Sequence, residues 1–318
     1  MNKQTGRKGK YQTRQKKRSH SLSIFLTIAV CIGGVWFLVD KSISTIPEPA
    51  FLEFPENETD QTTLQESETE PVIETEETEA ETEPENEDIA ALIDMAKTNP
   101  KVQEVLDNRD LYPDDVLHML AFNEETLDFV LDYPQKKGTP CEVTNIDSFE
   151  YGTIPNLYQW DQRWGYQSYG NSVIAVNGCG PTALAMVIAG LTGDTSITPA
   201  RVATYSDDNN YYIQGQGTSW ALMMNEGCNH FGIGSMELQL MENTIQSELL
   251  MGHPIICSMG PGDFTSDGHF IVLTDWTEEG IKINDPNSKK KSEQLWDYSQ
   301  LEGQILNLWS YYVLEYSY

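Results

Sequence analysis

The residues best suited to chemistry are one cysteine, one histidine and one aspartate. Cys179 lies in the motif GCGP, His269 is the second residue of GHFIVLTDW, and Asp285 lies in GIKINDPN. A cysteine thiolate is a nucleophile, an imidazole can serve as its base, and a carboxylate can orient the imidazole. Each residue alone has an ordinary explanation as a small buried side chain, a structural histidine or a turn former. In the order Cys, His, Asp they together predict acyl transfer through the Cys179 sulfur.

The segment after Cys179 predicts a buried helix. Residues 182–191 are almost wholly apolar or small, which is typical of a helix buried on all sides. Gly180 and Pro181 fit its start, and its end is expected near residues 190–193. Cys179 would then lie at the helix N-terminus, where the positive end of the dipole and the unpaired N–H groups stabilise a thiolate and an oxyanion.

Among the five histidines, His269 has the most suitable surroundings. It opens an apolar run rich in β-forming residues, and a second short strand ends at Asp285. Two antiparallel strands joined through residues 278–280 would bring His269 and Asp285 side by side. His230, by contrast, is expected near the end of a helix over residues 218–230.

These motifs resemble those of a known family. Residues 154–312 are similar to the peptidase C39-like family of papain-fold cysteine peptidases, and the motifs that carry the resemblance are LYQWDQRWGYQSYG, NGCGPTALAMVIAGLTGD, GHPIICSMGPGDFTSDGHFIVL and INDPNS. The resemblance implies an α+β, papain-like fold in which the cysteine-bearing helix packs on an antiparallel sheet. It also implies that Cys179 is the nucleophile, His269 the base and Asp285 the residue that orients it.

The sequence indicates less directly which side chain would donate a hydrogen bond to the oxyanion. Bacteriocin-processing relatives have a glutamine a few residues before the cysteine, but Val173 occupies the position six residues before Cys179. Gln159 and Gln162 lie further upstream. The resemblance favours Gln159, in YQWD, although either amide could serve chemically.

The N-terminal region predicts attachment to a membrane. Residues 1–21 carry eight Lys or Arg and no acid, and residues 22–39 carry no charge. As a helix the second segment spans about 27 Å, close to a hydrocarbon core of about 30 Å. The basic tail is expected to stay in the cytoplasm and everything after the helix to be exported. A cleaved signal peptide is the alternative, but the apolar run is long and no A-x-A-like site follows it.

Two further segments precede the candidate catalytic domain at 150–318. Residues 40–88 contain eighteen acids and one lysine, which predicts an extended, disordered linker. Residues 89–134 show helical periodicity and predict three or four small helices packed together or against the next domain. No chemistry is visible in this helical segment.

The composition and the lack of certain motifs argue against some classes of function. A formal charge of −29 argues against a nucleic-acid partner, and no motif predicts a metal or another cofactor. A disulfide between Cys141 and Cys228 stays open. We therefore expect a membrane-anchored, extracytoplasmic cysteine peptidase that hydrolyses peptide or isopeptide bonds, with cell-wall peptides among the candidate substrates. A papain-like acyl transferase and a catalytically silent tethered binding module are the alternatives.

Overall fold

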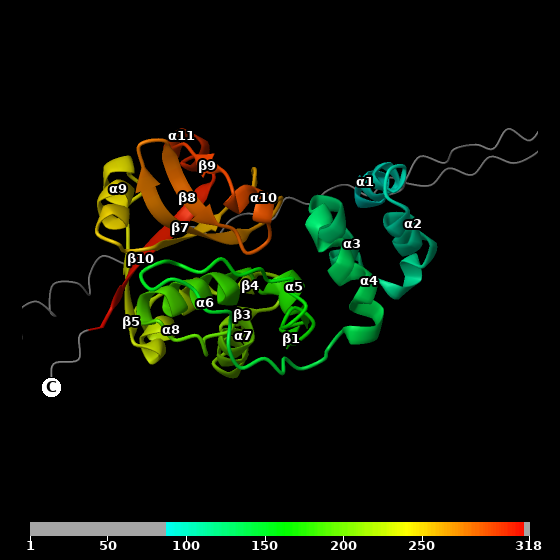
Figure 1. Cartoon of the computed structure of the whole chain (residues 1–318), viewed down its shortest axis with the longest axis horizontal. Helices are drawn as coiled ribbons and strands as arrows, with labels where there is room; N and C mark the ends of the chain where they lie inside the picture. Colours follow the sequence, from blue (N-terminus) through cyan, green and yellow to red (C-terminus); the bar gives the residue numbers. More distant parts are fainter. Residues whose placement is uncertain (1–86, 315–318) are drawn as a thin grey trace, which may run out of the picture. The chain divides into compact units, whose positions relative to one another are not determined.

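The computed structural model describes residues 87–314 (Figure 1). The predicted basic tail, the predicted membrane helix and nearly all of the predicted acidic linker lie outside these residues. Between residues 87 and 314, no helix is both long and apolar enough to cross a bilayer. Glu87 and Asp88, which composition assigned to the linker, already form the first turn of a helix, where acidic side chains favour the helix dipole.

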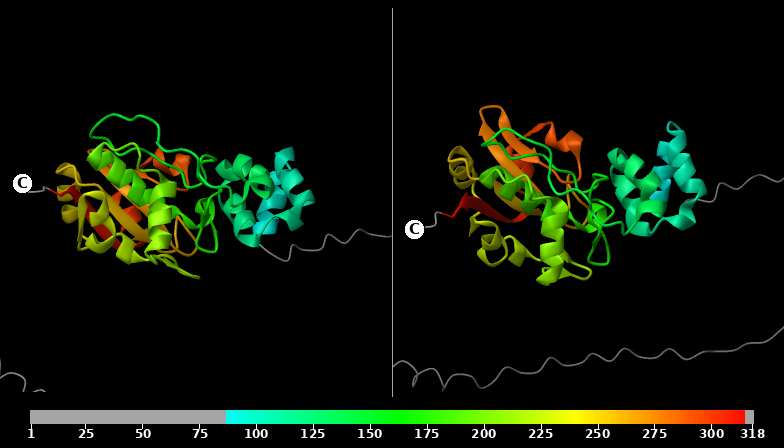
Figure 2. Two further views of the ribbon diagram at one scale, coloured as in Figure 1. Left: turned by 90° about the horizontal axis from the view of Figure 1, so that it is seen from below. Right: turned by 60° about the horizontal axis from the view of Figure 1, so that its bottom comes forward.

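Residues 87–136, here called the helical unit, form four α-helices. These are α1 (Glu87–Ala96), α2 (Pro100–Asp107), α3 (Asp114–Phe122) and α4 (Leu127–Lys136). Asn99 caps α2 by accepting a hydrogen bond from the Lys101 main-chain N–H, and Pro100 occupies the first helical position. The helices share a buried apolar core, and Figure 2 shows them gathered as a group.

The core of the helical unit continues into the domain that follows, residues 137–314, here called the α+β domain. Tyr166, Val173 and Ala175 of that domain are buried in the same apolar cluster. The rings of Phe129 and Tyr166 stack with centroids 4.3 Å apart, and the Tyr166 hydroxyl donates to the Phe129 carbonyl at 3.2 Å. The two parts therefore share buried apolar surface, which is the main source of stability in protein interiors.

A buried helix, α6 (Cys179–Thr192), forms the centre of the α+β domain. Residues 180–190 are all buried, as the apolar run predicts. The helix ends at Gly193, which adopts the left-handed conformation with φ 72° and donates its N–H to the Ala189 carbonyl. Glycine tolerates this conformation without a side-chain penalty. The predicted start and end of this helix are confirmed.

A six-stranded antiparallel sheet packs against α6. Its strand order is β5-β10-β6-β7-β8-β9. The strands are β5 (Ile233–Glu237), β6 (Ile255–Met259), β7 (His269–Thr277), β8 (Gly280–Asn284), β9 (Leu295–Trp296) and β10 (Ile305–Val313). Two short antiparallel pairs join β1 (Ser168–Tyr169) to β2 (Ser172–Val173) and β3 (Tyr212–Ile213) to β4 (Gly217–Thr218). The remaining α-helices are α5 (Ile174–Asn177), α7 (Pro199–Asp208), α8 (Asn225–Cys228), α9 (Glu242–Leu250), α10 (Lys289–Ser292) and α11 (Tyr298–Leu301).

Both faces of the sheet are buried, and alternate residues of each strand belong to different cores. On β7, Phe270 and Val272 join the core built around α6, whereas Ile271 and Leu273 join the core that contains α9. This follows from the period of two in a strand. Figure 1 shows α6 and α9 on opposite sides of β7. The expectation of a mixed fold with a helix packed on an antiparallel sheet is confirmed.

The predicted helix over residues 218–230 is wrong. Thr218 belongs to β4, and the rest divides into a 3-10 turn at Trp220–Leu222, the short helix α8 and a second 3-10 turn at Asn229–Phe231. Met224 has an extended backbone with ψ 169°, which interrupts the helix. Gly227 then packs so closely on the Leu222 main chain that a Cβ atom would lie 2.4 Å from the Leu222 carbonyl oxygen. The local backbone conformation at Met224 and at Gly227 therefore overrides the helical pattern.

Candidate active site

Cys179 is the first residue of α6, so the start of this helix positions its side chain. Gly178 caps the helix, and its carbonyl accepts from the Thr182 N–H. Cys179 is partly buried and faces two cavities. A helix leaves the main-chain N–H groups of its first turn without helical partners, and such groups can bind an anion.

His269 and Asp285 are brought together by the hairpin of β7 and β8. His269 is the first residue of β7, and Asp285 directly follows β8, whose last residue Asn284 pairs with Val272. The His269 Nε2 atom lies 2.7 Å from Asp285 Oδ1, and both side chains are buried. The antiparallel arrangement of these two strands is the one that the sequence predicts.

The environment of His269 favours its charged form. Burial alone disfavours the imidazolium, but it is outweighed by the charge and hydrogen bond of Asp285 and by the hydrogen bond and charge of Cys179, and the pKa of His269 is raised. Because Asp285 occupies Nε2, Nδ1 is the ring nitrogen that remains for the Cys179 sulfur. Cys179 and His269 line the same two cavities, and Asp285 contacts the His269 ring.

Of the two candidate glutamines, only Gln159 lies beside Cys179. Gln159 is 5% exposed and lines the same cavity as Cys179 and His269. Its Nε2 atom donates to the Ala175 carbonyl at 2.6 Å and to the Val176 carbonyl at 3.4 Å. Gln162 is exposed instead and donates to the Asp128 carbonyl at 3.3 Å.

The thiol and the imidazole lie where two cavities meet. One cavity has a volume of about 380 Å³ and the other about 580 Å³, and both are lined by Cys179, His269 and Asp267. The glycine-rich segment 215–217 borders the second cavity, and the segment 264–268 borders the first. Cys179 and His269 are therefore accessible from two sides of the cleft.

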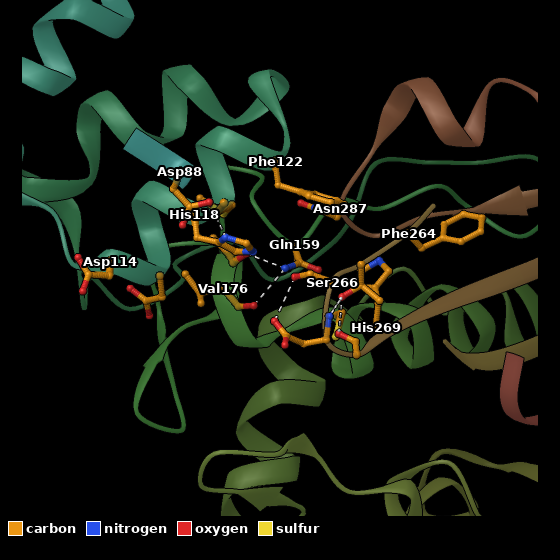
Figure 3. A pocket seen from close by; sticks show the side chains of 17 residues that line it. Asp88, Asp114, His118, Phe122, Gln159, Val176, Phe264, Ser266, His269 and Asn287 are labelled. Atoms are coloured by element: carbon orange, nitrogen blue, oxygen red, sulfur yellow. Dashed lines mark hydrogen bonds and ion pairs between the residues drawn. The ribbon is translucent and has the colours of Figure 1, made fainter. Parts of the chain in front are cut away.

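The helical unit also contributes to this cleft, which the sequence did not indicate. Asp114 and His118 of α3 line the first cavity, and Figure 3 shows them across from His269. His118 is itself paired with Asp88 through Nδ1, at 2.9 Å. A helical pattern shows which residues face a core, but it does not show which other segment its polar face will meet.

The comparisons with known proteins agree with these features. A model of the peptidase C39-like family matches residues 151–315. This chain belongs to the peptidase C39-like family. No match was found among curated proteins.

Two solved structures are similar to this C39-like chain. One is the peptidase domain of Streptococcus ComA, described as a bifunctional ABC transporter involved in a quorum-sensing pathway; it is 18% identical, the match covers 44% of this chain and 93% of that one, and the TM-score is 0.34. The other is a C39-like peptidase from Bacillus anthracis, 16% identical, with 52% and 97% covered and a TM-score of 0.29.

The remaining described cysteines of this C39-like chain are poorly suited to nucleophilic chemistry. Cys141, Cys228 and Cys257 are free thiols, so the open question of a disulfide between Cys141 and Cys228 is answered in the negative. Burial raises the pKa of each of these thiols, that of Cys228 to about 11. Within residues 87–314, no group of three or more His, Cys, Asp or Glu side chains is placed to hold a metal ion.

Proposed function

We propose that this chain is a cysteine peptidase that uses Cys179 as nucleophile, His269 as base and acid, and Asp285 to hold the imidazole. The observation that carries the proposal is the buried 2.7 Å contact between His269 and Asp285, beside a cavity that Cys179 and His269 both line. A histidine buried with a carboxylate on one nitrogen and a thiol on the other is suited to hold a thiolate–imidazolium pair.

The reaction begins with attack of the Cys179 thiolate on a peptide or isopeptide carbonyl carbon. A C–S bond forms and the carbonyl π electrons move to oxygen. The resulting oxyanion accepts hydrogen bonds from the Cys179 main-chain N–H and from Gln159 Nε2. The Gln159 amide has two hydrogens, and the one that makes the longer, 3.4 Å bond to the Val176 carbonyl can be redirected to the oxyanion.

The tetrahedral intermediate then collapses. The C–N bond breaks as His269 transfers its proton to the leaving amine, and a thioester to Cys179 remains. His269, now neutral, takes a proton from water, whose oxygen attacks the thioester. The C–S bond breaks, the acid is released, and the proton on His269 restores the ion pair.

The predicted location of the domain outside the cytoplasm limits the peptides that it can meet. If residues 22–39 anchor the chain with its tail in the cytoplasm, the enzyme meets extracytoplasmic or cell-wall peptides. Cleavage of a leader peptide at a double-glycine site inside the cell is then not implied.

The proposal is tested by covalent trapping with a library of electrophilic peptides. We expect the full-length protein to gain a single adduct at Cys179, located by peptide mass mapping, and the preferred side chains to be read from the library. Cys179→Ala should lose the adduct and the turnover, whereas Cys141→Ala, which removes another partly exposed thiol, should keep both. Normal turnover by Cys179→Ala would refute the proposal.

A further inference from the structure

The position of Asp285 depends on the loop that follows it. Residues 285–291, here called the aspartate loop, lead from β8 into α10. The Oδ1 atom of Asp285 that contacts His269 also accepts from the Asn287 N–H at 2.8 Å, and the Asp285 N–H donates to Ser292 Oγ at 2.9 Å. A displacement of this loop would therefore change the contact between Asp285 and His269.

The helical unit holds the middle of the aspartate loop. Asn123 Nδ2 donates to the Asn287 carbonyl, and Trp160 Nε1 donates to the same oxygen at 2.8 Å. One main-chain carbonyl thus receives one donor from the helical unit and one from the α+β domain. The opposite side of the Asn123 amide caps its own segment, because Oδ1 accepts from the Glu125 N–H at 3.1 Å.

Glu125 holds the end of the same loop. Its Oε2 atom accepts from Ser288 Oγ at 3.1 Å and from the Lys289 N–H at 2.9 Å, and its Oε1 atom accepts from the Lys290 N–H at 3.3 Å. Bonds from N–H groups to a carboxylate are stronger than neutral ones. The carboxylate therefore ties the first turn of α10, which is too short to be stable alone, to the helical unit.

A third contact comes from the residue just before Asn123. The Lys291 Nζ atom lies 4.7 Å from the centre of the Phe122 ring, within the range of a cation–π interaction. Phe122, Asn123 and Glu125 thus contact Asn287 and the four residues after it. We call residues 122–125 the clamp.

We propose that the clamp positions Asp285 against His269, so that the peptidase site is complete only when the helical unit is docked. Asn123 and Glu125 are positioning residues in this inference, since neither touches the reacting atoms. The inference rests on the proposed function, because it assigns the helical unit a part in the same reaction. Small displacements of orienting groups have large effects on reaction rates.

The thiol reactivity of Cys179 reports the placement of Asp285 without requiring a substrate. Asp285, after β8, contacts the His269 ring, and Cys179, at the start of α6, also raises the pKa of His269. The other titratable groups that line the cavity around it are Asp267 in the loop before β7 and, from the helical unit, Asp88, Asp114, Asp115 and His118. Variants in the clamp leave all of these side chains in place, so a changed pH profile points to the position of Asp285.

A charge-matched variant isolates the hydrogen bond to Asn287. Asn123→Asp keeps an oxygen that can cap the Glu125 N–H, but it replaces the Nδ2 donor with an oxygen that repels the Asn287 carbonyl. Glu124→Gln, made in the same chain, restores the net charge at an exposed position. Glu124→Gln alone is the control. Glu125→Ala removes all three acceptor contacts, and Glu125→Gln keeps one acceptor oxygen.

The measurement is the rate of Cys179 alkylation by iodoacetamide between pH 4 and pH 10 in the full-length protein, read by mass spectrometry. We expect native protein and Glu124→Gln to react rapidly well below neutral pH. In Asn123→Asp with Glu124→Gln, and in Glu125→Ala, the onset of reactivity should move to higher pH. The rate at pH 6 should then fall by about threefold to tenfold, since one pKa unit corresponds to a factor of ten. Glu125→Gln should lie between.

The outcomes separate the two proposals. Native protein that reacts like an ordinary exposed cysteine would refute the proposed function, whatever the variants do. A native protein with the fast thiol, whose two clamp variants keep the same profile and the same thermal unfolding midpoint, would overturn the inference alone. If Glu125→Ala does not fold, Asn123→Asp with Glu124→Gln decides, because that chain keeps the cap and the charge.

Discussion

At the level of single side chains, Gln159 is held differently from the proposed catalytic residues Cys179, His269 and Asp285. Its main-chain N–H donates to the Pro286 carbonyl at 2.8 Å, so its backbone is tied to the loop that carries Asp285. Its side chain contacts the segment just before Cys179 instead. The Gln159 Oε1 atom is buried and has no hydrogen-bond partner within the described part of the chain. The main chain of Gln159 is therefore held by the loop after β8, and its side chain by the segment before α6.

Gln159→Ala should lower kcat by about 10²–10³-fold with little change in KM, because an oxyanion donor acts mainly in the transition state. Cys179 alkylation should stay within about twofold of native, since no oxyanion forms in that reaction. Gln162→Ala is the matched control and should leave kcat unchanged, because Gln162 is exposed. Equal kcat values for the two variants would exclude Gln159 as the donor.

The protonation of His269 predicts how stability varies with pH. Burial opposes the charged ring, but Asp285 and then Cys179 outweigh it, and the pKa of His269 is raised to about 10. A group whose pKa is higher in the folded state stabilises that state fully below its unfolded pKa of about 6.5, and the effect is lost as the pH rises through the folded pKa. Urea unfolding midpoints of native protein and of His269→Gln should therefore converge between pH 7 and pH 10. A constant difference over that range would contradict the assignment.

The residues of the proposed site could be named from sequence, but their contacts could be predicted only in part. Cys179, His269 and Asp285 stand in motifs that specify a helix start and two strand ends, so their meeting follows from local structure and one hairpin. Gln159 was favoured over Gln162 by resemblance alone. The structure adds a physical difference between them, since one is buried in the cleft and the other is exposed.

At the level of elements, α6 and the β7–β8 hairpin fix the geometry of the site. Helix α6 and strands β7 and β8 could be predicted because the spacing of apolar residues along the sequence indicates both the type of element and its burial. Residues 218–230 could not, because the extended backbone of Met224 and the close approach of Gly227 to the Leu222 main chain leave no signal in the helical pattern. Local propensity is a weak prior where tertiary contacts are this tight.

The end of α6 provides a test of this element. Gly193→Ala should lower the free energy of unfolding by about 1 kcal/mol, because a Cβ atom is strained at φ 72°. Gly303→Ala is the matched control: no atom lies within 4 Å of its added Cβ, and its φ is not positive. Urea denaturation of the two variants, measured at one pH, compares them. Equal stabilities would show that the left-handed cap contributes nothing.

At the level of the whole described chain, the helical unit and the α+β domain share one apolar cluster. Their contact joins residues far apart in sequence; for example, 164 positions separate Asn123 from Asn287. Sequence patterns predict that the helices exist, but the choice of docking surface depends on shape and on buried hydrogen bonds. For this reason the part that α3 and the clamp play at the cleft could not be read from the sequence.

Phe129→Ala should destabilise both parts together by about 3 kcal/mol, the cost typical of removing a buried aromatic ring. Phe129 is 1% exposed and stacks on Tyr166. Tryptophan fluorescence gives the measurement, because residues 87–136 contain no tryptophan whereas the α+β domain contains six. The fluorescence transition should therefore move although the substitution lies in the helical unit. An unmoved transition would show that the two parts unfold independently.

The order in which the reacting groups occur along the chain has a consequence for biosynthesis. During translation, Cys179 at the start of α6 is added to the chain long before His269, and Asp285 after β8 is the last of the three. Until the hairpin has paired and closed over α6, the nascent polypeptide holds a thiol without its base. Under the proposed function, a newly made chain cannot digest itself or its neighbours during synthesis, and peptidase activity requires the completed tertiary structure.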